Sequence, residues 1–67
     1  MIEITLNGVS KQLAAPLSVT DLLAAEGLAG KRVAVEKNGE IVPKSQHASV
    51  QVDAGDRFEI VVAVGGG

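Results

Sequence analysis

Two Asn-Gly pairs, Asn7-Gly8 and Asn38-Gly39, constrain the fold of this 67-residue chain more than any other feature. Asn and Gly tolerate the positive φ angles of a two-residue type I′ turn, so each pair sets the register of its flanking strands locally. The first pair joins IEITL, in which alternate residues are apolar, to VSKQL. The second joins VAVEK to EIV, and Pro43 then removes a ladder donor. We therefore predict two hairpins, the second ending in a short edge strand.

A single short helix is predicted between the hairpins. In SVTDLLAAEG the apolar residues change from alternating to helical spacing. Ser18 can cap the helix, Asp21 can complete a capping box, and Gly27 can supply the left-handed residue that often ends a helix.

The longest predicted strand is RFEIVVAV, which follows a turn at Asp53–Asp56. Alternate side chains of a strand point to opposite faces of the sheet. The set expected to face the core comprises Phe58, Ile60, Val62 and Val64. The set expected on the opposite face comprises Arg57, Glu59, Val61 and Ala63.

The predicted order of elements is β-β-α-β-β-β, which indicates an α+β fold with one helix packed on one face of a mixed sheet. The ubiquitin-like β-grasp arrangement has this order, and its last strand lies in the middle of the sheet beside the first. We expect one domain over residues 1–64, followed by a flexible C-terminal glycine tail over residues 65–67. A chain of this length buries only about 60% of the surface that its unfolded form exposes, so its stability should be modest.

Composition excludes several classes of protein. The 46% hydrophobic and 21% charged content is that of a folded soluble domain. The absence of Cys excludes disulfides and thiolate metal sites and favours a reducing, cytoplasmic compartment, and we expect neither a signal peptide nor a membrane span. A net charge of −2 and a single aromatic residue, Phe58, argue against nucleic-acid binding.

The sequence contains no convincing catalytic or metal-binding motif. His47 is the only histidine, and without a second His or a Cys it indicates neither a zinc site nor a catalytic triad. We expect it at the surface of a loop. The Ser residues and carboxylates lack partners at useful spacing, so the chain is not expected to be an enzyme or to bind a cofactor.

Val61 and Ala63 are the apolar residues of the last strand that should face away from the core. One interpretation is that local structure covers them. The other is that they form an exposed apolar patch where partner proteins dock, beside the start of the tail.

Three stretches, VAVEKNGEIVPKSQH, GDRFEIVVAV and the final GGG, resemble the ThiS family of sulfur carriers of thiamine biosynthesis, and the resemblance covers essentially the whole chain. It implies that an E1-like (ThiF-like) adenylyltransferase activates the terminal carboxylate with ATP. It further implies that the carboxylate becomes a thiocarboxylate and passes its sulfur to a thiazole synthase (ThiG-like). By the family pattern Gly67 is the modified residue, Gly66 its partner in the motif, and Gly65 an extension of the tail.

The chemistry of a glycine terminus agrees with this role. A terminal carboxyl has a reference pKa of about 3.3–3.7 and is anionic at neutral pH. Glycine lacks a Cβ, so an extended chain of glycines can pass through a narrow channel into another active site. Two alternatives remain at this point: a sulfur carrier for another pathway, such as one resembling the small subunit of molybdopterin synthase, and a ubiquitin-like modifier or binding module.

Overall fold

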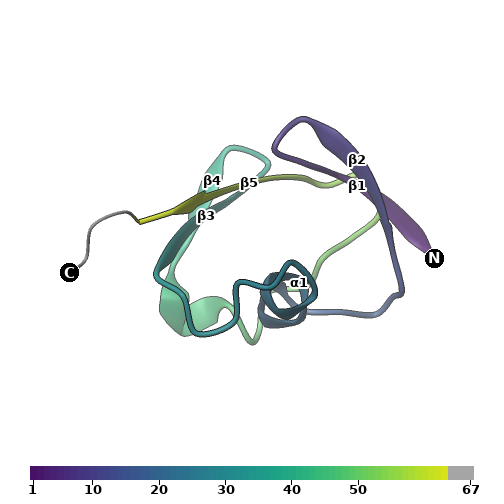
Figure 1. Ribbon diagram of the computed structural model, residues 1–67. Coiled ribbons are helices and arrows are strands. Elements are labelled where there is room, and N and C mark those ends of the chain that lie inside the picture. Colours follow the sequence, from purple (N-terminus) through teal and green to yellow (C-terminus); the bar gives the residue numbers. More distant parts are fainter. Residues whose placement is uncertain (64–67) are drawn as a thin grey trace.

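The protein folds into one mixed sheet of five strands with a helix against one face of the sheet (Figure 1). The structure is a computed structural model and describes residues 1–63. In chain order the elements are β1 (Ile2–Leu6), β2 (Val9–Leu13), α1 (Val19–Ala25), β3 (Val33–Lys37), β4 (Glu40–Val42), the 3₁₀ helix η1 (Lys44–Gln46) and β5 (Arg57–Val62). The predicted α+β class and β-β-α-β-β-β order are confirmed.

The last strand, β5, lies in the middle of the sheet. The order across the sheet is β2-β1-β5-β3-β4, with β1 and β5 parallel and the other neighbours antiparallel. The predicted place of β5 in the middle of the sheet beside β1 is thus confirmed, and the three-residue β4 lies at an edge, as the proline after it indicated.

Both Asn-Gly pairs adopt the predicted turn conformation. The φ angles are 50° and 82° at Asn7 and Gly8, and 52° and 86° at Asn38 and Gly39. All four residues lie on the positive side of φ, as a type I′ turn requires.

Helix α1 begins with the predicted capping box. The Asp21 backbone N–H donates to Ser18 Oγ (3.1 Å), and the Ser18 backbone N–H donates to Asp21 Oδ2 (2.9 Å). Gly27, with φ of 74°, follows the C-terminal end of the helix. The helix has seven residues, and no helix within residues 1–63 is long and apolar enough to cross a membrane.

His47 is buried, so the prediction of a surface histidine is wrong. The turn of η1 brings its ring back to the end of β4, where Nε2 lies 3.1 Å from the Val42 carbonyl oxygen. A carbonyl only accepts, so Nε2 carries the hydrogen. The His47 carbonyl in turn accepts from the Thr20 N–H of α1 (3.0 Å). His47 thus joins β4 to the first turn of the helix.

The core lies between α1 and the sheet. Its buried apolar residues are Ile4, Leu6, Leu17, Val19, Leu22, Leu23, Val35, Val42, Val52, Phe58 and Ile60.

The predicted core face of β5 is confirmed at two positions and wrong at a third. Phe58 and Ile60 are buried, but Val62 is 41% exposed. The reason is geometric, because α1 crosses β5 and is seen nearly end-on in Figure 1. A helix is only about 10–12 Å across with its side chains, whereas a six-residue strand extends for about 20 Å. Figure 1 shows the end of β5 extending past α1. Val64, also predicted to face the core, lies outside the described residues.

Candidate functional site

The predicted tail, Gly65, Gly66 and Gly67, lies outside the described residues, but the strand that leads to it is described. The backbone N–H of Ala63 donates to the Arg32 carbonyl (2.9 Å), one residue beyond the end of β5. The last described residues are therefore held at the central strand of the sheet.

Strand β5 is fixed on one side by the Asn7 side chain. Its Oδ1 accepts from the Ile60 N–H (2.8 Å) and its Nδ2 donates to the Ile60 carbonyl (3.1 Å). The amide thereby takes the place of a backbone partner and extends the short parallel ladder between β1 and β5, in which Leu6 is paired with Phe58.

The Asn38 side chain also binds the backbone of β5, on the side of that strand that faces β3. Its Oδ1 accepts from the Arg57 N–H (2.8 Å), while its Nδ2 donates to Asp56 Oδ1 (3.0 Å). Each hairpin turn thus contributes its Asn side chain to the strand that precedes the tail. Sequence reasoning assigned both residues to turns and missed these contacts, which join positions far apart in the chain.

An ionic network surrounds Asp56 at the start of β5. Lys37 Nζ lies 3.2 Å from Asp56 Oδ2 and 3.3 Å from Asp53 Oδ2. Burial opposes ionisation of Asp56, but hydrogen bonds from Asn38, the Asp53 N–H and Lys37 outweigh it and lower the pKa of Asp56 below its usual 3.8. Desolvation of Lys37 opposes its charged form, but the carboxylates of Asp56 and Asp53 outweigh this effect and raise the pKa of Lys37 above 10.5. This network lies at the end of β5 away from Ala63 and stabilises the turn.

The outer face of the sheet, which we define as the face away from α1, carries exposed apolar residues near the end of β5. Val61 is 64% exposed, and Ala63 is also exposed, so no segment within residues 1–63 covers these two side chains. The register places Ala34 of β3 directly opposite Val61, and Ile41 of β4, on the same face, is 76% exposed. The patch therefore extends across three strands, beyond the two residues that the sequence indicated.

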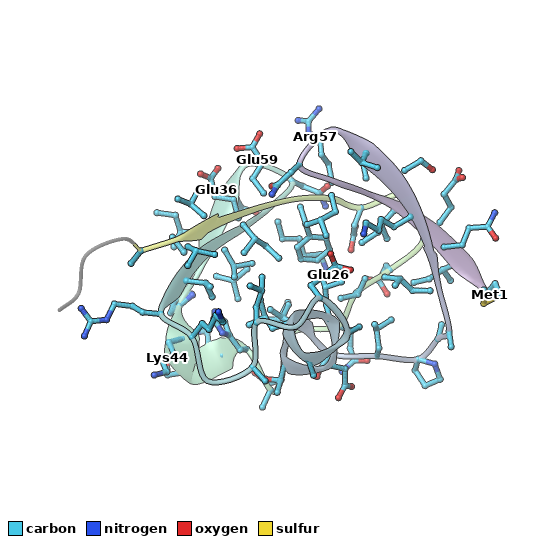
Figure 2. All side chains as sticks on the ribbon, viewed as in Figure 1. Met1, Glu26, Glu36, Lys44, Arg57 and Glu59 are labelled. Carbon is cyan, nitrogen blue, oxygen red and sulfur yellow. The ribbon has the colours of Figure 1, made fainter. Side chains whose placement is uncertain are left out.

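Two carboxylates adjoin this patch on the outer face. Glu36 of β3 and Glu59 of β5 are directly opposite each other in the register, and like charges in that position destabilise a sheet. Figure 2 shows both side chains, with Arg57, on the side of the sheet away from α1. Neither glutamate makes an ion pair within residues 1–63. Their opposition could not be read from the sequence, because local pattern does not say which strands pair.

No cluster of three or more His, Asp or Glu residues that could hold a metal ion occurs in the part of the chain that the structure describes.

Comparison with known proteins gives consistent matches. The sequence model of the ThiS family matches residues 4–67. The sulfur carrier protein ThiS of Bacillus subtilis is 44% identical over 50 residues, which are 75% of this chain and 76% of that protein. The crystal structure of the thiamine biosynthesis protein ThiS from Geobacter metallireducens superposes with a TM-score of 0.84 at 35% identity, covering 98% of this chain and all of that one.

A longer protein also matches. A thiazole synthase from Paramagnetospirillum magneticum is 44% identical over 66 residues, which are 98% of this chain. The chain spans only about a fifth (20%) of the length of that synthase.

Proposed function

Because the chain belongs to the ThiS family, we propose that it is a sulfur carrier of thiamine biosynthesis that holds sulfur as a thiocarboxylate on Gly67. The observation that supports this most strongly is the family match over residues 4–67, which includes the glycines. The structural match to a ThiS protein at 35% identity supports the same role. The chain is proposed to deliver a reactive group and not to catalyse a reaction.

The proposed chemistry has two steps. An oxygen of the Gly67 carboxylate attacks the α-phosphorus of ATP, a P–O bond forms, and pyrophosphate leaves. A hydrosulfide-level sulfur donor then attacks the acyl carbon of the adenylate, a C–S bond forms, and AMP leaves with the electrons of the broken C–O bond. Both steps take place in another protein's active site, and the absence of Cβ atoms lets the glycines enter it.

The proposed partners are an E1-like adenylyltransferase, which uses the ATP, and a thiazole synthase, which takes the sulfur. The second is supported by the thiazole synthase of Paramagnetospirillum magneticum, a fifth of which resembles this entire chain. A synthase that carries such a segment indicates that the two functions work together.

We place partner docking on the apolar patch of the outer face, around Val61 and Ala63. An exposed apolar patch on a small soluble domain commonly marks an interaction site. The patch includes Ala63, which is two residues before Gly65 in the sequence, so a partner docked there is within reach of the glycines. Glu36 and Glu59 would add charge selectivity, because a complementary cation on the partner relieves their repulsion.

Intact-mass spectrometry tests the proposed function. The protein is incubated with adenylyltransferase, MgATP and a sulfur donor, and the expected mass gain is that of sulfur replacing one oxygen. Oxidation of Met1, the only methionine and 85% exposed, adds almost the same mass, so fragment ions must place the gain at Gly67.

Other outcomes identify the alternatives. Covalent joining of the chain to lysines of other proteins would instead indicate a protein modifier. A thiocarboxylate that a molybdopterin synthase consumes and a thiazole synthase does not would indicate a carrier of another pathway. A fragment mass that stays unchanged at Gly67 after full ATP turnover would refute the carrier proposal.

A further inference from the structure

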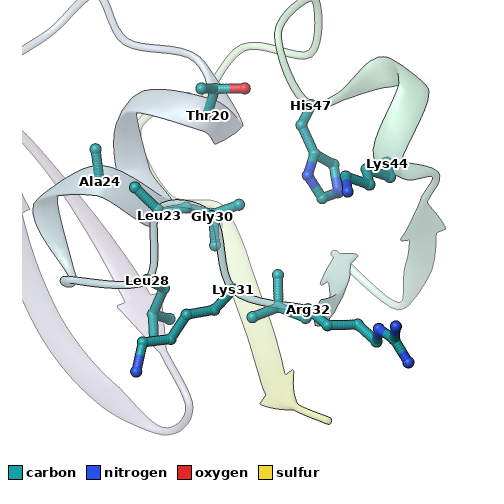
Figure 3. A pocket seen from close by; sticks show the side chains of 11 residues that line it. Thr20, Leu23, Ala24, Leu28, Gly30, Lys31, Arg32, Lys44 and His47 are labelled. Atoms are coloured by element: carbon teal, nitrogen blue, oxygen red, sulfur yellow. The ribbon is translucent and has the colours of Figure 1, made fainter. Parts of the chain in front are cut away.

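A pocket lies on the helix side of the molecule, away from the outer face of the sheet. It has a volume of about 260 Å³ and is bounded by the side of α1 that carries Thr20, Leu23 and Ala24, by the loop that leads into β3, and by η1. Its apolar lining includes Leu23, Leu28 and Val33, and the buried His47 ring forms part of its wall. Figure 3 shows Leu23, Leu28 and His47 around a common opening.

Cations gather at this pocket. Of the six Lys and Arg residues of the chain, Lys31, Arg32 and Lys44 line it. None of the three makes an ion pair within residues 1–63, whereas Lys11 and Lys37 are both paired with carboxylates. In Figure 3 Lys44 and His47 come from η1 and the turn after it, while Lys31 and Arg32 extend to either side of the loop before β3. Three of the four Lys and Arg residues that make no ion pair within residues 1–63 thus lie around one apolar opening, and the fourth, Arg57, lies on the outer face of the sheet.

The size of the pocket indicates what kind of occupant fits. Small-molecule sites usually have volumes of about 300–1,000 Å³, so this pocket is below that range. A volume of this order suits one large side chain, and interfaces are commonly anchored by an aromatic or aliphatic residue in such a pocket.

The wall is already held in place without an occupant. The His47 ring donates to the Val42 carbonyl and the His47 carbonyl accepts from Thr20, so η1 and α1 are joined at the pocket. A preformed pocket loses little conformational entropy when it is filled.

We propose that this basic pocket is a second docking site, which receives a large apolar side chain from an acidic segment of another protein. The apolar lining accepts the anchor, and Lys31, Arg32 and Lys44 attract carboxylates on either side of it. The site lies on the opposite side of the sheet from Glu36 and Glu59. A partner of the basic pocket is therefore acidic, whereas a partner that docks on the outer face carries positive charge. The proposal does not depend on sulfur transfer.

Amide NMR of the full chain tests the site with defined peptides. The probe is acetyl-Glu-Glu-Phe-Glu-Glu-amide, and the comparisons are the same peptide with Ala for Phe and with Lys for every Glu. We expect saturable shifts confined to α1, the following loop and η1 with the probe, and much weaker binding of both comparison peptides.

Two matched pairs of variants locate the binding. Ala24→Phe fills the pocket and should abolish binding, whereas Ala25→Phe, an exposed neighbour outside the pocket, should not change it. Arg32→Glu should weaken binding about fivefold or more, as for the loss of about 1 kcal/mol, whereas the same charge change at Arg57 should leave it unchanged.

Several outcomes would overturn the proposal. The Lys peptide could bind as tightly as the Glu peptide. Both variants of a matched pair could lose binding to the same extent. The chemical shift changes could centre on the outer face of the sheet instead of the pocket. Saturation by phenylacetate as tight as by the peptide would instead assign the pocket to a small anion. Shifts of the same amides on raising the concentration of the protein alone, with slower diffusion, would assign it to a second copy of the chain.

Discussion

Asn7 and Asn38 each have two roles, one in the backbone of a hairpin turn and one through the side-chain amide. Each adopts a positive φ at a hairpin turn, and each uses its side-chain amide to bind the backbone of β5. Glycine would satisfy the first requirement and fail the second. At the scale of single residues, the strand before the tail is therefore held by side chains as well as by its ladder.

Replacing Asn7 by Gly separates these properties. The variant keeps the positive φ accessible but removes two hydrogen bonds to Ile60, each worth about 0.5–1.5 kcal/mol. We expect the free energy of unfolding, measured in urea, to fall by about 1–2 kcal/mol. An unchanged value would show that the turn conformation is all that Asn7 contributes.

Phe58 is the residue on which the core depends most. It is completely buried, and removal of a buried Phe typically costs about 3–5 kcal/mol. A domain of this size seldom has more than about 3–5 kcal/mol in total, so Phe58→Ala should be largely unfolded by circular dichroism. Val61→Ala on the exposed side of the same strand is the control and should melt as the wild type does. A cooperative, near-native melt of Phe58→Ala would contradict the packing described here.

At the scale of elements, the turn before β5 is joined to β3 by charge. The lowered pKa of Asp56 means that its contribution to stability is present above about pH 3.8 and is lost as the pH falls through the folded-state value. The raised pKa of Lys37 means that its contribution is present below about pH 10.5 and is lost as the pH rises through the folded-state value.

The pH dependence of unfolding should therefore change when Asp56 is replaced by Asn. We expect the variant to be less stable than the wild type at neutral pH and to lose less of its stability between pH 5 and pH 2. Urea unfolding at each pH measures this, and Glu40→Gln at exposed β4 controls for the loss of one carboxylate. If the free energy of unfolding of Asp56→Asn fell as steeply with decreasing pH as that of the wild type, Asp56 would not be a cause of the acid dependence.

A substitution on the outer face of β5 can separate an effect on folding from an effect on partner docking. Val61 is 64% exposed, so Val61→Glu should melt normally, whereas burying its carboxylate unpaired against an apolar partner costs several kcal/mol. Half-maximal adenylation should then need far more carrier, because about 1.4 kcal/mol is tenfold in affinity. Val9→Glu is the matched control, because Val9 is 57% exposed and lies on β2, two strands away from β5. Adenylation of Val61→Glu at wild-type concentrations would place docking elsewhere.

At the scale of the whole molecule, the proposed function separates a folded domain from the glycines that follow it. A chain without Gly66 and Gly67 should keep its circular dichroism spectrum and melting temperature, because the core that residues 1–63 form includes neither glycine. ATP–pyrophosphate exchange should be lost, because the carboxylate would no longer reach the activating enzyme. A truncated chain that is still adenylated and thiocarboxylated would disprove the assignment of the tail.

The local features of this fold could be predicted from the sequence, because each is determined by neighbouring residues. The positive φ angles of the Asn-Gly turns, the capping box of Ser18 and Asp21, and the edge position of the strand before Pro43 follow from steric limits and hydrogen bonds a few residues apart. The ThiS resemblance was likewise carried by contiguous stretches, and the order of the elements, which matches the β-grasp arrangement, indicated the central place of the last strand.

Tertiary structure alone decided which distant groups meet. The opposition of Glu36 and Glu59 depends on the register between β3 and β5, which no local pattern specifies. The exposure of Val62 arises because β5 extends past the helix that crosses it, and the burial of His47 arises because the chain after β4 turns back onto that strand at η1. The basic pocket arises in the same way, because Lys44 joins Lys31 and Arg32 only when η1 packs beside the loop before β3. Such contacts depend on how the whole core is packed, because the chain closes its long loops only where burial offsets the entropy of ordering them.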